Sequence, residues 1–400
     1  MKSNTKINQK IESEWFQKTI THQEELYIPI AIARELKLED NPLVAVAIKK
    51  NNCSIEYPIR CRYRIKSDGN CFRITLPHDN RKDINGVVSI KIIKLSSPKE
   101  IQTIDTDIDL SKFSYSNVLE WIDDKFIVLW DNTKHPLIVR RSIEAKKIAK
   151  YLGLYYADGG KSSHYSCICS TKDITKIMSL GYHNIIANPK YTSSICYRKF
   201  YHEDNKIIEK RIKSYWRDIH KDISVNIHGL KLTNLWSNEY GEYRMDDSRS
   251  LALKIHLWLT EELLKKGNIN KSLLEDFFMG GALGDGGVSN RRKEAFQHIL
   301  ISSNKQEYHV WENICINLKI PYQIKVVPNR NSAYIIISNY YVVYDLLTKG
   351  LFKEYTKRRI KLIAGLKNRI ETKFIEKGRI YRRNKGLYRE DINLKLLEVD

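Results

Sequence analysis

The chain has 400 residues, 42% of them hydrophobic, which is too long for one ordinary hydrophobic core and enough for two or three. Its 68 Lys and Arg residues outnumber 47 Asp and Glu residues, and the resulting formal charge of +21 favours a polyanionic partner, with nucleic acid first. A lysine-rich proteome or a hot habitat would raise the same number, so the charge becomes evidence only where it clusters.

The cysteines and the apolar runs indicate the compartment. The seven cysteines are odd in number and contain no CxxC pair with zinc-ligand spacing, so we expect reduced thiols. The N-terminal stretch MKSNTKINQKIESEW has no features of a secretory signal, and no apolar run is long enough to cross a bilayer. We therefore expect a cytoplasmic protein with no membrane partner.

The first part of the chain, residues 1–98, predicts a small mostly-β domain because short β-rich runs alternate with polar turns. Two stretches within it, YIPIAIARELKLEDNPLVAVAIK and FRITLPHDNRKDINGVVSIKIIK, share a strand that ends in Pro, a short link and a second alternating strand. That order resembles the swapped-hairpin, AbrB-like DNA-binding fold, and an unrelated small β-barrel fits the same runs. Residues 99–135 are more acidic and less periodic, which indicates a connector.

From residue 136 onward, a sequence feature occurs twice. SIEAKKIAKYLGLYYADGG predicts one helix that ends at a glycine, and LLEDFFMGGALGDGGVSNRR repeats the plan of helix, acid, two glycines and a polar strand-like run. Gly153 and Ala157 in the first copy, and Gly280 and Gly284 in the second, are spaced i, i+4. Residues at this spacing share one helix face, so the two helices can pack with their backbones close together.

Such packing would place Asp158 beside Asp285, each at the end of its helix. A carboxylate at a helix C-terminus faces the negative end of the macrodipole, which costs roughly 0.3–1 kcal/mol, and two carboxylates side by side repel each other further. A cation between them would remove both penalties. The plain alternative is that each Asp-Gly-Gly is only a helix-ending turn.

The motifs YLGLYYADG at 151–159 and FMGGALGDG at 278–286 resemble the two signature motifs of single-chain LAGLIDADG homing endonucleases. The similarity covers about residues 140–380, and it departs from the usual pattern where Tyr156 and Leu283 occupy the position of the sixth-place acid. The resemblance implies an α+β fold with two pseudo-symmetric αββαββα repeats, at 136–268 and 269–375, that form a saddle over double-stranded DNA. It also implies a monomer with an internal pseudo-twofold axis.

The resemblance further implies a catalytic metal site. Asp158 and Asp285, followed by Gly159 and Gly286, would bind Mg²⁺ or Mn²⁺, because Mg²⁺ prefers one or two carboxylates together with waters. Relatives of this kind place a basic residue near the centre late in each repeat. The candidates here are Lys353, with Lys357 as second choice, in the second repeat and Arg244 in the first.

The strands after each motif are expected to carry the DNA-reading side chains, because they alternate polar and apolar residues like a sheet with one wet face. Arg suits guanine, Gln suits adenine and Lys suits phosphates, although each candidate also fits an ordinary solvated surface. The candidates are Arg198, Arg291, Arg292, Gln297, Gln323, Lys325 and Arg330.

The C-terminal part of the chain is basic: residues 351–389 contain 14 Lys or Arg residues and 3 Glu residues, with aromatic residues among them. IKLIAGLKNRI within it predicts a helix, and 376–400 is expected to be a basic tail. A stretch of this kind would make DNA affinity fall steeply with salt.

The sequence thus favours a site-specific, divalent-metal-dependent double-strand DNA endonuclease. Two alternatives remain open: a transcription regulator that uses the same scaffold without cutting, and an RNA maturase that assists intron splicing. Retention of both acids favours the nuclease, because a pure DNA-binding protein has no use for a repulsive pair.

Overall fold

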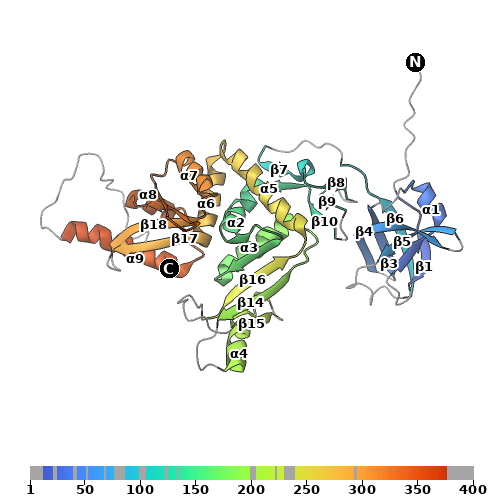
Figure 1. Cartoon of the computed structure of the whole chain (residues 1–400), viewed down its shortest axis with the longest axis horizontal. Helices are drawn as coiled ribbons and strands as arrows, with labels where there is room; N and C mark the ends of the chain where they lie inside the picture. Colours follow the sequence, from blue (N-terminus) through green and yellow to red (C-terminus); the bar gives the residue numbers. More distant parts are fainter. Residues whose placement is uncertain are drawn as a thin grey trace, which may run out of the picture. The chain divides into compact units, whose positions relative to one another are not determined.

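The computed structural model describes residues 12–20, 25–38, 43–50, 53–66, 69–75, 86–98, 105–121, 125–132, 135–198, 204–220, 223–228, 239–291 and 295–375. The fold mixes helices and sheets. The chain divides into two compact units: the first comprises Met1–Gln102 and Asp109–Ser142, and the second comprises Thr103–Ile108 and Ile143–Asp400 (Figure 1). Among the described helices, none is both long enough and apolar enough to span a membrane.

The first unit contains a six-stranded sheet in the order β1-β6-β3-β4-β5-β2, with one short helix, α1. The bounds are β1 (Phe16–Ile20), β2 (Glu25–Ile28), α1 (Ile30–Glu35), β3 (Leu43–Lys50), β4 (Cys53–Lys66), β5 (Gly69–Thr75) and β6 (Gly86–Lys94). Each strand of the first similar stretch pairs with its counterpart in the second: β2 pairs with β5, and β3 pairs with β6. Alternate residues of these strands, such as Val46 and Ile90, form a buried core. The AbrB-like resemblance stays a prediction.

Residues 99–135, expected as a connector, contain regular structure where they are described. The elements are β7 (Asp107–Asp109), a short 3-10 helix η2 (Leu110–Lys112), β8 (Asn117–Glu120) and β9 (Phe126–Trp130), followed by β10 (Leu137–Arg140) and β11 (Ser142–Glu144). β8, β9 and β10 form an antiparallel sheet whose Val128 and Trp130 pack on Leu43 and Ala45 of β3. This small sheet therefore shares a core with the first unit.

The second unit contains two sheets with helices packed on them. Its first half consists of α2 (Ala145–Asp158), β12 (Gly159–Gly160), β13 (Tyr165–Cys169), α3 (Lys172–Ile185), β14 (Thr192–Arg198), α4 (Asn205–Trp216), β15 (Ser224–His228), β16 (Glu242–Asp247) and α5 (Ser250–Gly267). Its second half consists of α6 (Lys271–Asp285), β17 (Gly286–Arg291), β18 (Ala295–Ser303), α7 (Tyr308–Asn317), β19 (Gln323–Val326), β20 (Ala333–Ile337), α8 (Tyr340–Thr348) and α9 (Thr356–Ile375).

The two sheets of this unit share one strand order. The first runs β12-β13-β16-β14-β15 and the second β17-β18-β20-β19, so they match once β15 is set aside. Each sheet buries alternate residues against helices: Cys167 lies opposite Met245 in the first, and Ile301 lies opposite Ile335 in the second. The residues between them form the other face, where Ile168 is 46% exposed. The alternation predicted from the sequence is therefore present on these strands.

The predicted helix IKLIAGLKNRI lies within α9, which packs on β17 and β18. The Lys361 ammonium donates to the Val288 carbonyl at 2.7 Å, and the Asn290 side chain donates to the Lys361 carbonyl at 3.1 Å. The expected basic tail, 376–400, lies outside the described residues.

Helices α2 and α6 lie side by side (Figure 1), and among the described elements their contact is the most extensive. Glycines make this approach possible. A methyl group added at Gly153 would strike the Phe277 carbonyl oxygen, and one at Gly280 would strike the Lys150 carbonyl oxygen. At Gly284 it would lie 2.8 Å from the Ala157 methyl group. The small residues therefore mark the line along which the two backbones meet.

We predict that Gly280→Ala destabilises the second unit by about 1–3 kcal/mol, because the new methyl group meets backbone that cannot move aside independently. Urea unfolding followed by tryptophan fluorescence measures the loss. Gly287→Ala is the matched control, since its methyl group would lie 3.4 Å from the nearest Leu300 side-chain atoms, an ordinary contact. Equal unfolding midpoints for the two variants would contradict the crossing described above.

Candidate metal centre and nucleic-acid interface

Asp158 and Asp285 are the last residues of α2 and α6, and the helix crossing brings them together. A methyl group added at Gly284, the residue before Asp285, would lie 2.9 Å from Asp158 Oδ2. The paired motifs therefore end in neighbouring carboxylates, as the sequence predicts.

The glycines after the two acids have extended backbone, with φ −80° at Gly159 and φ −75° at Gly286. They do not adopt the left-handed conformation that often ends a helix. A methyl group at Gly159 would strike the Tyr155 carbonyl, and one at Gly286 would strike the Ala282 carbonyl. Glycine is needed here because the chain passes from helix to strand with no intervening turn.

Both carboxyl groups titrate well above their ordinary range. Burial raises the pKa of Asp158 to about 7, with the charge of Asp285 as the next cause, and burial raises the pKa of Asp285 to about 6. Proximity to Arg358 opposes both shifts, and the charge of Lys161 also opposes the shift at Asp285. The pair is therefore short of positive charge in the protein alone.

Two carboxylates with raised pKa values suit a hard divalent cation that completes its coordination with water or phosphate oxygens, as Mg²⁺ and Mn²⁺ do. Within the described part of the chain, no group of three or more His, Cys, Asp and Glu side chains is placed to hold a metal. The donor set thus fits a magnesium-type site at Asp158 and Asp285 and does not fit a closed structural zinc site.

Arg358, in the first turn of α9, is a basic residue whose charge acts on both acids. Its Nη1 donates to the carbonyls of Leu283 at 2.7 Å and Gly284 at 2.9 Å, at the end of α6. Its guanidinium lies 4.2 Å from the centre of the Tyr355 ring, and burial lowers its pKa from the ordinary value. A cation here complements the negative end of the α6 dipole as well as both carboxylates.

The basic candidates chosen from sequence lie elsewhere. Lys353 lies in the turn before α9 and Lys357 on α9, and both are exposed. Arg244, on the open face of the first sheet, pairs with Asp246 at 2.7 Å. Arg358 belongs to the same GLFKEYTKRR stretch, and only the starting residue of α9 determines which basic side chain turns toward the acids.

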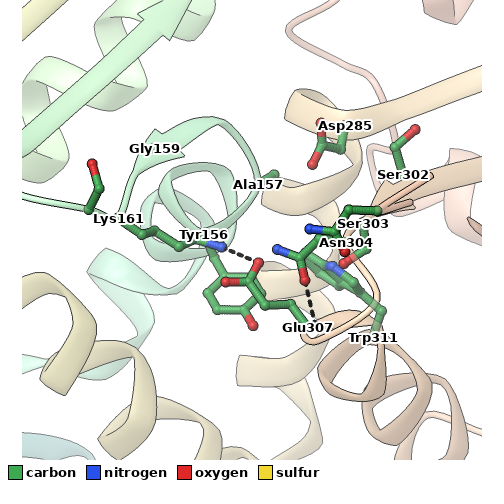
Figure 2. A pocket seen from close by; sticks show the side chains of 12 residues that line it. Tyr156, Ala157, Gly159, Lys161, Asp285, Ser302, Ser303, Asn304, Glu307 and Trp311 are labelled. Atoms are coloured by element: carbon green, nitrogen blue, oxygen red, sulfur yellow. Dashed lines mark hydrogen bonds and ion pairs between the residues drawn. The ribbon is translucent and has the colours of Figure 1, made fainter. Parts of the chain in front are cut away.

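On one side of Asp285 there is a cavity of about 570 Å³, which the sequence reasoning missed. Lys161 reaches into it from the first half and pairs with Glu307 of the second half at 2.6 Å (Figure 2). The Lys161 ammonium also lies 3.9 Å from the centre of the Tyr156 ring. Hydroxyl and amide side chains line the rest of the polar wall: Ser162, Ser302, Ser303, Asn304 and Asn331.

The DNA-reading candidates of the second sheet that can be placed are exposed. Gln323 and Lys325 lie on β19 opposite Ile336 and Tyr334, Arg330 follows in the turn to β20, and Gln297 accepts a hydrogen bond from Ser289 at 3.3 Å. Arg198 is the last residue of β14 and Arg291 is the last residue of β17. The structure does not describe their side chains, and Arg292 lies outside the described residues.

Behind α2, a buried cluster of aromatic residues holds the first motif in place. The His256 ring contacts those of Tyr151, Tyr155 and Tyr165, and burial lowers its pKa to about 4, which keeps the imidazole neutral. Tyr155 also donates to the Gly160 carbonyl at 2.9 Å, which fixes the strand that follows Asp158. These residues position the site and do not face the acids' cavity.

Neither a protein-family model nor a curated protein sequence matches the chain. Among solved structures, it is similar to the N-terminal LAGLIDADG domain of DUF199/WhiA at 14% identity and a TM-score of 0.30, over 51% of this chain and 81% of that one. It is also similar to a glycine-to-serine variant of I-DmoI in complex with its target DNA in the presence of Mg, at 14% identity and a TM-score of 0.27, over 51% and 92% of the two chains.

We predict that the metal-free protein becomes less stable as the pH rises from about 4 to 7, on the order of 2 kcal/mol from the acid pair. The folded pKa values of Asp158 and Asp285 lie above the unfolded ones, so the folded pair keeps its protons while the unfolded chain loses them above about pH 4, and stability falls until the folded pair has ionised at pH 6 to 7. Urea unfolding in EDTA across this range measures the slope. Asp158→Asn should flatten it and the surface control Asp276→Asn should not; an unchanged slope in Asp158→Asn would contradict the assignment.

Proposed function

We propose that the protein is a site-specific double-strand DNA endonuclease of the LAGLIDADG homing type, which hydrolyses phosphodiester bonds with Mg²⁺ or Mn²⁺. The observation that carries the proposal is the pair of partly buried carboxylates, Asp158 and Asp285, held side by side by the glycine-lined crossing of α2 and α6. A protein that only binds DNA gains nothing from keeping two like charges together in a poorly solvated site.

A metal bound there would supply an activated water and stabilise the departing 3′-oxygen, as two-metal phosphodiester sites do. The chain's own residues prepare for this chemistry. Asp158 and Asp285 present carboxylate oxygens, and the Arg358 charge favours their ionised forms. The short strands that begin at Gly159 and Gly286 lead from the acids into the two sheets.

DNA would lie on the open faces of the two sheets, which we propose form a saddle with pseudo-twofold symmetry in a monomer. Support comes from the shared strand order of the sheets and from the basic residues that cluster in 351–389. The open face of the second sheet presents Gln323 and Lys325, whose chemistry suits adenine and phosphate respectively. Neutralising backbone phosphates would account for most of the affinity and make it depend on salt.

The decisive test compares the protein with an Asp158→Asn, Asp285→Asn double variant on a randomised duplex library, with and without Mg²⁺, followed by sequencing of the ends. We predict metal-dependent double-strand cuts with short 3′ overhangs for the natural chain, and a loss of cleavage by at least about 10³-fold in the double variant. Specific DNA binding should survive in both. Selected binding without cleavage under any divalent metal would instead identify a regulator, and selective binding of intron RNA a maturase.

A second prediction concerns Arg358. Removing its charge in Arg358→Gln should raise the pKa of both aspartates further, so that the pH at which half of the Mn²⁺ is bound moves upward by about one unit. Electron paramagnetic resonance of free Mn²⁺ across a pH series measures this shift without any cleavage.

Arg359→Gln is the matched control for that experiment. Arg359 donates to the carbonyls of Leu347 and Leu351 and so makes the same kind of hydrogen bond at another helix end. If the two variants moved the Mn²⁺ midpoint equally, Arg358 would have only a structural role.

A further inference from the structure

The surroundings of the two acids are unequal. Lys161 is the third residue after Asp158, and the third residue after Asp285 is Val288. Glu307, which holds Lys161, immediately precedes α7, whereas the residue immediately before α3 in the first half is Thr171. At these matched positions, the cation and its carboxylate partner occur on the Asp285 side, and the cavity lies there too.

The Lys161 ammonium is held but accessible. Its side chain is 22% exposed and that of Glu307 is 30% exposed, so solvent and ligands can reach the ion pair. A partly exposed Lys–Glu pair contributes little to stability, so another anion can displace Glu307 at small cost. Lysine serves phosphate groups as a mobile point charge with three donors.

The cavity has the size and lining for such an anion. Its volume of about 570 Å³ is within the range that accommodates small ligands, and therefore a phosphate with its sugar. Ser302, Ser303 and Ser162 contribute hydroxyl groups, and the partly exposed ring of Tyr156, which packs edge-on against the buried Trp311, gives an apolar surface for a sugar. Asp285 lies on the same cavity, so a phosphate here would adjoin one acid of the pair (Figure 2).

We propose that Lys161 is a positioning residue for a DNA phosphate group beside Asp285, and that Glu307 holds its ammonium in the free protein. The catalytic consequence of this inference rests on the proposed function. Lys161, from the first half of the unit, would orient the DNA strand that is cut next to Asp285, the acid of the second half. Binding of DNA exchanges the Glu307 carboxylate for a phosphate on the Lys161 ammonium. At the matching position of the second half, the chain has Val288 in place of a lysine.

The binding test uses a fluorescein-labelled duplex of random sequence in EDTA, so that it requires neither metal nor cleavage. Lys161→Met should weaken binding and reduce the slope of log Kd against log salt by about one, the contribution of one phosphate contact. Glu307→Gln frees the ammonium and should tighten binding about threefold, the scale of an exposed ion pair. Lys161→Arg should restore most of the affinity, because it keeps the charge.

A matched control removes the effect of net charge. Lys349→Met and Glu275→Gln change the same two charges in the pair Lys349–Glu275, which is 2.7 Å long and lies outside the cavity. If the Lys161 variants moved binding no more than these controls, the proposal would be overturned. It would also be overturned if Lys161→Met and Glu307→Gln weakened binding alike and lowered the unfolding midpoint alike, since that is the behaviour of a structural ion pair.

The cleavage test uses supercoiled plasmid that carries the site selected by the natural protein. Lys161→Met should accumulate nicked circles, with one strand cut on the order of a hundredfold more slowly and the other unchanged. Equal slowing of both strands would refute the one-sided role while leaving the nuclease intact. If the natural protein cuts nothing, the proposed function fails, and the EDTA binding measurements still decide whether Lys161 contacts phosphate.

Discussion

The close crossing of α2 and α6 is the constraint on which the rest of the second unit depends. Because Gly153, Gly280 and Gly284 carry no side chains at the contact, the two backbones meet directly, and each helix must end beside the other. Both sheets then start from the crossing, since β12 and β17 begin at the residues that follow Asp158 and Asp285. A local packing requirement thereby determines where two carboxylates lie and where the two sheets begin.

This arrangement is electrostatically unfavourable in the protein without a bound cation. Each carboxylate is placed at the negative end of a helix and near a second carboxylate, and burial raises the pKa of both. Arg358 offsets part of the penalty from the end of α6, where it also satisfies carbonyl groups that the helix leaves unpaired. With Arg358 near both acids and Lys161 near Asp285, the pKa values of both acids are still raised, so the centre can accept a further cation. A site that was tuned for stability alone would have replaced one of the acids.

The sequence was sufficient for the parts of the fold that depend on local periodicity and on small-residue spacing. The i, i+4 glycines predicted the helix crossing and the neighbouring acids, and alternating residues predicted the strands of both sheets. The sequence was insufficient where a side chain's role depends on the direction in which the folded backbone points it. Lys353, Lys357 and Arg358 are all positively charged and nearly adjacent, and the start of α9 at Thr356 decides that Arg358 turns inward. The Lys161–Glu307 pair joins residues 146 positions apart, which no local pattern reveals.

The unequal surroundings of the two acids follow from the way one chain supplies both halves. Two identical subunits would have to present the same residue after each motif, so a lysine on one side would require a lysine on the other. A single chain is free of that restriction, and here Lys161 and Val288 occupy the matching positions. The glycine crossing must be conserved on both helices because each backbone needs the other's small residues. The residues that follow are not bound by this requirement, so the two sides of the centre can differ, as Lys161 and Val288 do.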